Sequence, residues 1–397
     1  MSAETSSLSQ TATQPQPVSR PEAWRELRSR FRAPPPPPLA PVAPTEDRIV
    51  WFDYAKGICI TLVVMMHSTL GVGDAMGGEG FMHEVVAFAR PFRMPDFFLL
   101  SGLFLFRVID RDWRTYLDRK VVHFAYFYTL WLVILTVVKH GAELGADPTA
   151  WAASFADALI QPNPNLWFIY VLPLFFVSTK LARALGLPGW ALWLAAVALQ
   201  TVPLHTGWEA IDDYGARYYV FFLTGYLLAP HVFKLAAWAR EHVPEAAIGL
   251  AGWFSFNAAI AFAASPVAGY AKVADVPGVR IAVGLVGAMA VITAASLPSR
   301  MNWAGYLRYA GRNSIVLYVS LVLPMAATRL LLLKSGLVSD IGVVSLIVTI
   351  IAVAVPLALH WAVRGTWARF LYERPAALKF ERRRADRSPA QAAAMAA

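Results

Sequence analysis

Apolar segments long enough, or nearly long enough, to cross a lipid bilayer recur along most of this chain. A transmembrane helix needs roughly 20 predominantly apolar residues. Ten segments meet or approach that length, and they lie near residues 49–70, 84–106, 120–138, 165–182, 188–203, 216–233, 246–265, 279–297, 306–328 and 341–363. Because lipid cannot satisfy backbone hydrogen bonds, each segment must satisfy its own as a helix. The pattern predicts an all-α polytopic membrane protein with about ten transmembrane helices.

Composition agrees with this class and excludes others. Of the 397 residues, 57% are hydrophobic and 15% are charged, with a mean hydropathy of +0.48. A soluble globular domain is much less apolar. The single cysteine, Cys59, excludes a disulfide framework and a cysteine-based metal site. A His-Glu-x-x-His pattern is absent from the sequence, so no metal site and no bound cofactor is predicted.

The two ends of the chain differ from the apolar region between them. Residues 1–45 are rich in Ser, Thr, Gln and Pro and lack the apolar core of a signal peptide, which predicts a disordered cytoplasmic tail. Residues 46–365 form the predicted transmembrane domain. Residues 366–397 are basic and Ala-rich, and we expect a largely disordered cytoplasmic tail there.

The positive charges predict an orientation. If the N-terminus is cytoplasmic, 26 of the 35 Lys and Arg residues fall on the cytoplasmic side and eight on the outer side, with Lys56 inside the first segment. This bias fits the positive-inside rule with both termini in the cytoplasm. The net charge of +9 then reflects topology and contact with the anionic lipid bilayer, so no nucleic acid partner is needed.

Three ionisable residues lie in the first apolar segment, Trp51–Ser68: Asp53, Lys56 and His67. Asp or Lys near the bilayer centre costs at least ~2.5–3.5 kcal/mol, so such residues usually face a protein interior and serve a function. Eleven residues of helix span three turns plus about 20° and ~16 Å, which places Lys56 and His67 on one face. The predicted orientation puts Lys56 toward the cytoplasm and His67 toward the outside.

Two interpretations of these residues remain open. Neutral imidazole can accept a proton from a hydroxyl that attacks an acyl carbonyl, so His67 is a candidate general base. His67 could instead make only a hydrogen bond between helices. Asp53 could bind substrate or simply pair with Lys56, which would lower the cost of burying both.

Polar residues in the second segment lie at the level predicted for His67: Arg90, Arg93 and Asp96. A cation beside His67 could stabilise a developing oxyanion, and Pro91 and Pro95 loosen the start of this helix. Alternatively, both arginines could extend toward the lipid headgroups.

Later segments carry further candidates for substrate binding, each with a structural alternative. Ser101 precedes Gly102 in a pair of small residues that could serve helix packing. The fourth segment begins with Asn165 and Trp167, and such a Trp could belong to an interfacial belt. In the ninth segment, Asn313, Ser314 and Tyr318 could bind substrate or cap and pack the helix.

Two blocks together resemble the acyltransferase-3 family of integral membrane acyltransferases, most closely its fucose O-acetylase-like bacterial branch. The first block is Phe52–His67, in which Lys56 and His67 match the family's Lys/Arg-x10-His pattern, and the second is Phe92–Gly102. The Asn165-Leu-Trp167 run and the Gly311–Tyr318 run match later family landmarks. The resemblance covers about residues 46–365.

The resemblance implies transfer of an acyl group, usually acetyl and sometimes succinyl, from cytoplasmic acyl-CoA to a hydroxyl. The acceptor in that family is typically a sugar of a surface glycan or a glycolipid, and the location is the bacterial inner membrane. The His is taken as the catalytic base and the basic residue eleven before it as essential. This chain departs from the family in one place, since the family often has a His shortly after the residue matching Tyr318.

Two other classes of function must be weighed against the enzyme. A transporter or flippase for a saccharide or lipid would also place paired charges and a broken helix around an internal cavity. A purely structural scaffold explains the apolar segments but not three aligned ionisable groups. Dependence on acyl-CoA discriminates the enzyme from the transporter.

Overall fold

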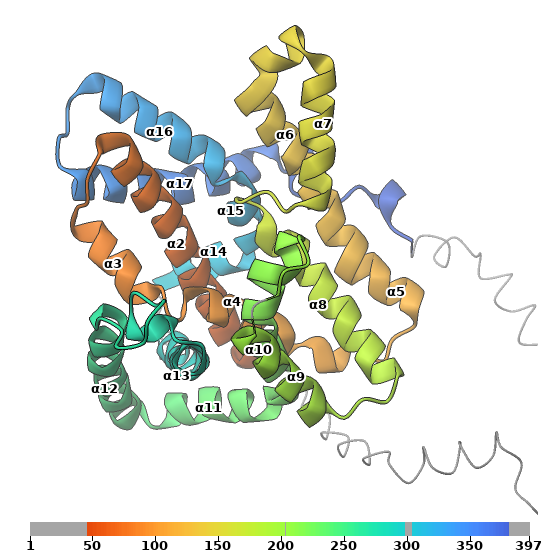
Figure 1. Cartoon of the computed structure of the whole chain (residues 1–397), viewed down its shortest axis with the longest axis vertical. Coiled ribbons are helices and arrows are strands. Elements are labelled where there is room, and N and C mark those ends of the chain that lie inside the picture. Colours follow the sequence, from red (N-terminus) through yellow and green to blue (C-terminus); the bar gives the residue numbers. More distant parts are fainter. Residues whose placement is uncertain (1–45, 203, 298–303, 381–397) are drawn as a thin grey trace, which may run out of the picture. The chain divides into compact units, whose positions relative to one another are not determined.

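The computed structural model describes residues 46–202, 204–297 and 304–380, and the elements named within them are all helical (Figure 1). The prediction of an all-α fold is therefore confirmed. The predicted tail at 1–45 and the C-terminal stretch 381–397 lie outside the described residues.

The α-helices follow one another with short connections. In chain order they are α2 (Glu46–Met76), α3 (Phe81–Ala89), α4 (Arg93–Leu103), α5 (Trp113–Leu117), α6 (His123–Ala146), α7 (Pro148–Ile160), α8 (Trp167–Ala184), α9 (Gly189–Thr201), α10 (Ala216–Leu227), α11 (Ala229–Glu241), α12 (Val243–Phe262), α13 (Pro277–Ser296), α14 (Gly305–Arg312), α15 (Ser314–Ser320), α16 (Val322–Ser335) and α17 (Ile341–Val363). Short 3-10 or π turns lie between or after them: η1 (Leu105–Arg107), η2 (Asp118–Val122), η3 (Ala210–Gly215), η4 (Val273–Asp275), η7 (Trp367–Leu371) and η8 (Ala376–Leu378).

Six stretches of helix in the described residues are long and apolar enough to cross a membrane. They are Val50–Met76, Trp113–Gly141, Trp167–Ala184, Val243–Phe262, Pro277–Ser296 and Ile341–Val363. Two bent pairs, α10 with α11 at 73° and α15 with α16 at 53°, raise the number to eight if each pair is one span. The chain is thus a polytopic membrane protein, and these criteria give six to eight spans in place of the predicted ten.

Three predicted segments are not single helices. The sixth, 216–233, is divided at Leu228 into α10 and α11. The second, 84–106, is divided into α3 and α4 around Arg90–Phe92. Pro91 has no N–H to continue the hydrogen-bond ladder and disfavours helical backbone at the residue before it. The ninth, 306–328, is divided at Asn313 and at Leu321. Pro324 lies in the first turn of α16, the part of a helix where proline is tolerated.

Helix α2 is surrounded by other helices along its length. It packs against α3, α4, α13, α14, α15 and α17, and Figure 1 shows it between α3 and α14. Two glycines allow the closest approach, because a Cβ atom built on Gly311 would lie 1.8 Å from the main-chain oxygen of Asp53, and one on Gly57 would lie 2.1 Å from that of Leu307. Backbone contact between α2 and α14 therefore fixes which residues of α14 meet the first predicted site.

The contact between α4 and α10 uses small residues in the same way. A Cβ atom on Gly102 would lie 2.1 Å from the main-chain oxygen of Phe222, and one on Gly225 would lie 2.0 Å from that of Leu99. The packing interpretation of Gly102 is confirmed. This contact holds the buried face of α4 against α10.

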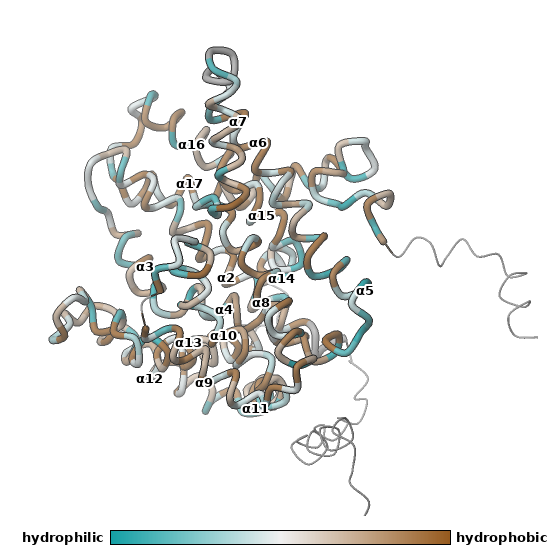
Figure 2. The backbone as a smooth tube through the Cα atoms, turned by 45° about the vertical axis from the view of Figure 1, so that its right-hand side comes forward, coloured by the Kyte–Doolittle hydropathy of each residue, from teal (hydrophilic) through white to brown (hydrophobic). Residues whose placement is uncertain are grey.

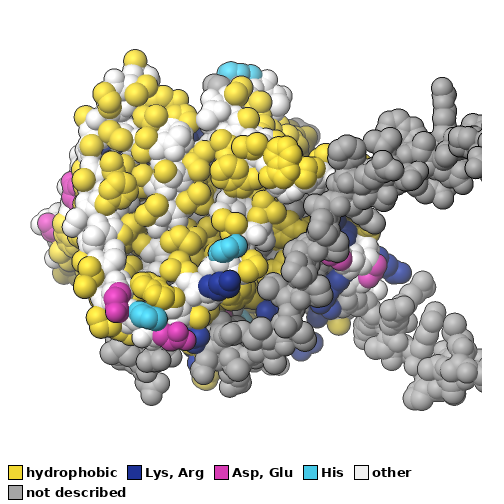
Figure 3. Space-filling view, turned by 90° about the horizontal axis from the view of Figure 1, so that it is seen from below, with side chains coloured by type: hydrophobic (Ala, Val, Ile, Leu, Met, Phe, Trp, Pro, Cys, Tyr) yellow, Lys and Arg dark blue, Asp and Glu magenta, His cyan; other side chains and the backbone are white. Residues whose placement is uncertain are grey.

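Hydrophobic side chains also cover much of the molecular surface. Figure 2 shows apolar residues along most of the helical backbone, and Figure 3 shows one face on which hydrophobic side chains predominate, with charged side chains between and around them. On α12 the large side chains of Ile248, Phe254 and Phe256 are exposed. Lipid is the solvent that such surfaces suit.

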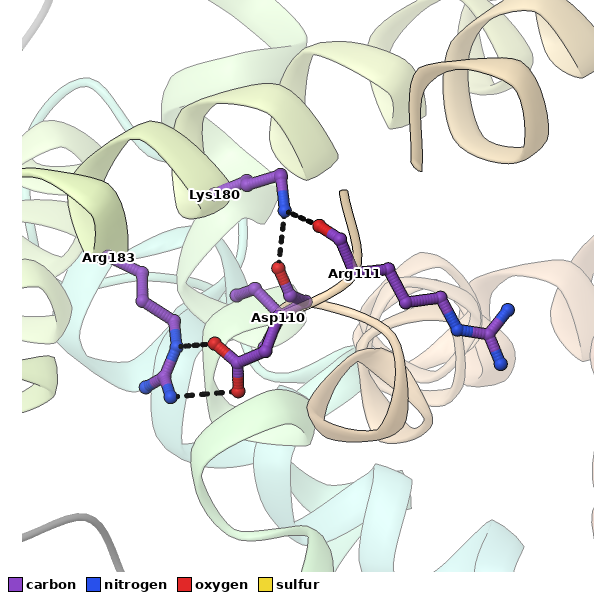
Figure 4. A network of polar contacts seen from close by, with 5 residues as sticks. Asp110, Arg111, Lys180 and Arg183 are labelled. Atoms are coloured by element: carbon purple, nitrogen blue, oxygen red, sulfur yellow. Dashed lines mark hydrogen bonds and ion pairs between the residues drawn. The ribbon is translucent and has the colours of Figure 1, made fainter. Parts of the chain in front are cut away.

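The connection after η1 is anchored to the end of α8. Figure 4 shows Lys180 donating hydrogen bonds to the main-chain oxygens of Ile109 (2.6 Å) and Arg111 (2.7 Å), while Arg183 forms a two-pronged ion pair with Asp110 at 2.6 and 2.9 Å. The Lys180 side chain is buried, and these two carbonyl oxygens stabilise its charge.

Residues 366–380, which the sequence assigns to the C-terminal tail, pack against the transmembrane helices. A buried ion pair joins Arg374 Nη2 to Asp118 Oδ2 at 2.7 Å, and Asp118 also accepts a hydrogen bond from the Phe380 amide at 3.1 Å. Tyr126 donates to the main-chain oxygen of Phe370 at 2.8 Å. Ordered packing in the described part of the chain therefore extends fifteen residues beyond the predicted domain boundary at 365.

Candidate active site

The candidate site is organised along α2. This helix is continuous from Glu46 to Met76, so the predicted alignment of Lys56 and His67 on one helix is realised, with ~16 Å between their levels. We call the two regions the Lys56 end and the His67 end. They are described in turn because their polar groups are satisfied in different ways.

The Lys56 end is a compact ion-pair cluster. Asp53 is only 7% exposed, and its two carboxylate oxygens face two cations: Lys56 Nζ at 3.6 Å and Arg312 Nε at 3.0 Å. Lys56 also lies over the ring of Phe52, 5.0 Å from its centroid. The pairing interpretation of Asp53 with Lys56 is confirmed.

Arg312 is the residue that sequence reasoning missed at this end. It directly precedes Asn313 in the ninth segment, and nothing local in the sequence links it to Asp53 in the first. The signal that could have found it is the neighbouring Gly311, whose missing side chain lets α14 contact the backbone of α2. Asn313 follows and donates its side-chain amide to the main-chain oxygen of Tyr309 at 2.8 Å, so it caps α14.

The His67 end holds a half-buried imidazole. The described residues provide it with no hydrogen-bond or ion-pair partner, so the alternative of a purely structural hydrogen bond between helices finds no support there. Arg93, at the start of α4, is close enough for its charge to act on the imidazole.

Several buried polar groups beside His67 have no partner in the described part of the chain. On α4 these are Nε and Nη1 of Arg93 and both carboxylate oxygens of Asp96, and on α2 they are the hydroxyls of Ser68 and Thr69. Arg93 is 8% exposed and Asp96 is 1% exposed, so neither extends to the headgroups. Leaving a buried polar group unsatisfied costs roughly 1–3 kcal/mol. A ligand that supplies hydrogen-bonding groups would remove that cost.

An aromatic stack borders Arg93. The Trp167 ring lies on Tyr214 with centroids 4.3 Å apart and near Tyr218 at 5.5 Å, and Tyr218 stacks on Phe98 at 5.2 Å. Trp167 thus belongs to an internal stack and not to an isolated interfacial position. Tyr214 and Tyr218 were not predicted as site residues. The sequence offers one signal for Tyr218, which directly follows the charged residue Arg217 at the start of an apolar segment.

Tyr318 is buried beside the same stack. Its hydroxyl accepts a hydrogen bond from the main-chain amide of Phe168 at 3.1 Å, and its ring contacts that of Phe168 at 5.6 Å. The bond joins α15 to the start of α8, directly after Trp167. Tyr318 therefore positions Trp167 through the backbone.

Three of the remaining predicted residues have partners of their own, which are Arg90, Ser101 and Asn165. Arg90 is 60% exposed and pairs with Asp275 at 3.0 Å. The Ser101 hydroxyl donates to the Phe97 oxygen in its own helix at 2.7 Å. The main-chain N–H of Asn165 donates to Oδ1 of Asn163 at 3.0 Å. Ser314 is half-buried at the start of α15.

The arrangement at the His67 end suits proton transfer beside a developing negative charge. An imidazole without a partner can accept a proton, and a buried guanidinium next to it can stabilise an oxyanion in a medium of low dielectric constant. The Lys56 end has no such free base. Its side chains instead offer cationic groups at the opposite level of α2.

Comparison with known proteins agrees with this chemistry. The model of the Acyltransferase domain of the acyltransferase-3 family matches residues 49–361, which is most of the chain. The inner membrane protein YcfT of Escherichia coli (strain K12) is 31% identical over 193 residues, a match that covers 42% of this chain and 53% of YcfT. No solved structure matches.

Proposed function

This chain belongs to the acyltransferase-3 family and is a multi-pass membrane acyltransferase, and from that premise we propose the reaction that it performs. It transfers an acyl group, acetyl or succinyl, from cytoplasmic acyl-CoA to a hydroxyl of a cell-envelope saccharide or glycolipid. The membrane is the bacterial inner membrane, in keeping with the name of the similar E. coli protein.

His67 is the general base of the proposed reaction. It takes the proton of the acceptor hydroxyl as that oxygen attacks the thioester carbonyl and forms the new C–O bond. The C–S bond then breaks, and the protonated imidazole returns the proton to the departing CoA thiolate. The observation that carries this proposal is an imidazole without a partner in the described residues, beside a buried and unpaired guanidinium.

Arg93 stabilises the oxyanion that forms on the carbonyl oxygen when the carbon becomes tetrahedral. Its Nε and Nη1 atoms are buried without hydrogen-bond partners in the described structure, so they can donate to an oxygen that becomes negative only in the transition state. Removing one donor of this kind costs about 10²–10³-fold in turnover. Asp96 follows Arg93 by one helical turn on α4 and is 1% exposed, and its carboxylate oxygens, which have no hydrogen-bond partner in the described residues, would accept hydrogen bonds from the donor.

Lys56 and Arg312 contact the donor from the other end. A cation pair that shares one carboxylate keeps a net positive charge, which suits the phosphates of CoA. The pantetheine arm is long enough to bridge the ~16 Å between the two levels of α2. The acyl thioester then lies at His67 while the nucleotide stays at the Lys56 end.

Mass spectrometry of cell-envelope glycans and lipids tests the proposal. A strain without the gene is compared with strains that express the wild-type protein or His67→Ala. We expect one class of saccharide or glycolipid to lose the mass of one acyl group in the deletion strain and in the His67→Ala strain. An unchanged set of masses, or a saccharide that changes its side of the membrane without changing its mass, contradicts acyl transfer and supports the transporter.

A further inference from the structure

Four arginines from four elements interact at the His67 end: Arg90 after α3, Arg93 on α4, Arg217 on α10 and Arg280 on α13. We call them the arginine cluster. Asp275 joins two of them, because its carboxylate pairs with Arg90 at 3.0 Å and its main-chain oxygen accepts a hydrogen bond from Arg280 at 2.6 Å. Arg93 follows Arg90 by three residues and is repelled by it, and Arg217 repels Arg280. Residues 90–93, 217 and 280 are far apart in the sequence, so only the fold reveals the cluster.

Carboxylates neutralise only half of this cluster. Arg90 pairs with Asp275 at 3.0 Å, and Arg217 pairs with Asp213 at 3.2 Å. Arg280 donates to the main-chain oxygen of Asp275 at 2.6 Å, which satisfies a hydrogen bond but adds no further negative charge. Even with the Asp96 carboxylate beside Arg93 counted, four guanidinium groups face three carboxylates. The local charge is therefore positive.

The cluster leads from the surface to the reacting atoms. The side chains of Arg90 and Arg217 are 60% and 50% exposed, whereas Arg93 is 8% exposed and interacts with His67. Positive charge at a protein surface raises the local concentration of anions and directs them inward. A neutral ligand would gain nothing from this arrangement.

We propose that the arginine cluster receives a negatively charged group of the acceptor and so makes the enzyme specific for anionic saccharides or anionic lipids. This inference rests on the proposed function. Arg217 and Arg280 hold the carboxylate or phosphate, since guanidinium groups bind both in a two-pronged manner. Arg93 stays with the reacting carbonyl, and the acceptor hydroxyl lies at His67.

The test compares matched acceptors with the full-length protein in liposomes. Radiolabelled acetyl-CoA is supplied with p-nitrophenyl glucoside, with p-nitrophenyl glucuronide, or with vesicles of phosphatidylglycerol. The glucoside and glucuronide differ by a carboxylate, and phosphatidylglycerol supplies a phosphate beside free hydroxyls. We expect transfer to at least one anionic acceptor to exceed transfer to the glucoside by ~10-fold or more, because a charge-assisted pair is lost with the neutral sugar. Which anionic acceptor is favoured separates the two sources of charge.

Variants connect the preference to the cluster. Arg280→Gln and Arg217→Gln should each raise KM for the anionic acceptor and lower the anionic-to-neutral ratio by ~10-fold, whereas Arg280→Lys should keep part of the preference. Lys272→Gln is the matched control, since this cation near η4 bonds the main-chain oxygen of Phe262 and lies outside the cluster. Thermal midpoints of all variants show whether they fold.

Three outcomes overturn the inference. The first is equal transfer to the neutral and anionic acceptors, and the second is no transfer to either anionic one. The third is a rise in KM for acetyl-CoA in Arg280→Gln, which would place the donor phosphates at the cluster. Failure of the proposed function is distinguishable from these, because it would appear as acetyl-CoA turnover that does not depend on His67.

Discussion

The polar groups at the two ends of one face of α2 are satisfied in different ways. At the Lys56 end, Asp53 meets two cations within 3.6 Å, so the charges are matched inside the protein. At the His67 end, Arg93 and Asp96 are buried without partners in the described residues. A satisfied cluster stabilises the fold whether or not substrate is present. An unsatisfied one costs stability, and it is retained where a ligand completes it.

Close helix packing at the Lys56 end gives the largest expected effect on stability. In Gly311→Ala the new Cβ atom would lie 1.8 Å from the main-chain oxygen of Asp53, so α14 must move away and the Asp53–Arg312 pair must break. We expect a loss of about 3 kcal/mol or more in the free energy of unfolding. Thermal unfolding in detergent measures it. Gly252→Ala on α12, where nothing lies within 4 Å, is the control and should not destabilise.

Replacing Arg93 should separate stability from activity. Arg93→Met removes an unsatisfied guanidinium and fills its volume with apolar atoms, so we expect stability to rise by about 1–3 kcal/mol. Turnover should fall by about 10²–10³-fold because an oxyanion donor is lost. Unfolding and acetyl-CoA turnover are measured on the same preparation. If the variant loses both stability and turnover, Arg93 is a structural residue. The Lys56 end and the His67 end would then not differ in the way described above.

Asp53 should behave in the opposite way. In Asp53→Asn, Lys56 and Arg312 lose their shared counter-charge, and because Arg312 is 56% exposed we expect a loss of only about 1–2 kcal/mol. Turnover should fall less than in Arg93→Met. Unfolding and turnover are compared with the double variant Asp53→Asn/Arg312→Gln, which removes the cation that is left unpaired. Unchanged stability together with abolished turnover would place Asp53 in the catalytic machinery.

The smallest effect is expected at Ser101. Its hydroxyl donates to the Phe97 oxygen one turn earlier in α4, so Ser101→Ala loses a bond that the helix does not need. We expect a change in stability within about 0.5 kcal/mol. A large rise in KM for either substrate, measured by steady-state turnover, would show that Ser101 contacts that substrate. The binding region around Arg93 and Asp96 would then reach the middle of α4.

Much of this fold follows from hydropathy and local spacing. The all-α class, the continuous first helix and the Asp53–Lys56 pair depend on residues close together in sequence. The breaks at Arg90–Phe92 and at Leu321 were harder to predict, because a proline can kink a membrane helix or end it, and neighbouring helices decide which. Their consequence is that spans expected to be single helices consist of shorter pieces.

The site was predictable only where its residues share a segment. Lys56 and His67 are on one helix, and Arg93 follows in the next apolar segment. Arg312 reaches Asp53 only because Gly311 allows two backbones to touch. The link from Arg90 through Asp275 to Arg280 depends on how η4 lies beside the end of α3 and the start of α13. Such contacts between distant segments leave no periodic signal in the sequence.

Release of free CoA from acetyl-CoA by purified protein in liposomes measures the contribution of His67 to the reaction. Wild-type protein is compared with His67→Ala and with His231→Ala, which replaces an exposed histidine on α11. We expect His67→Ala to lower the rate by about 10²–10⁴-fold, whereas His231→Ala keeps the rate and both proteins remain folded. Undiminished CoA release by folded His67→Ala protein would contradict the assignment of His67 as the general base.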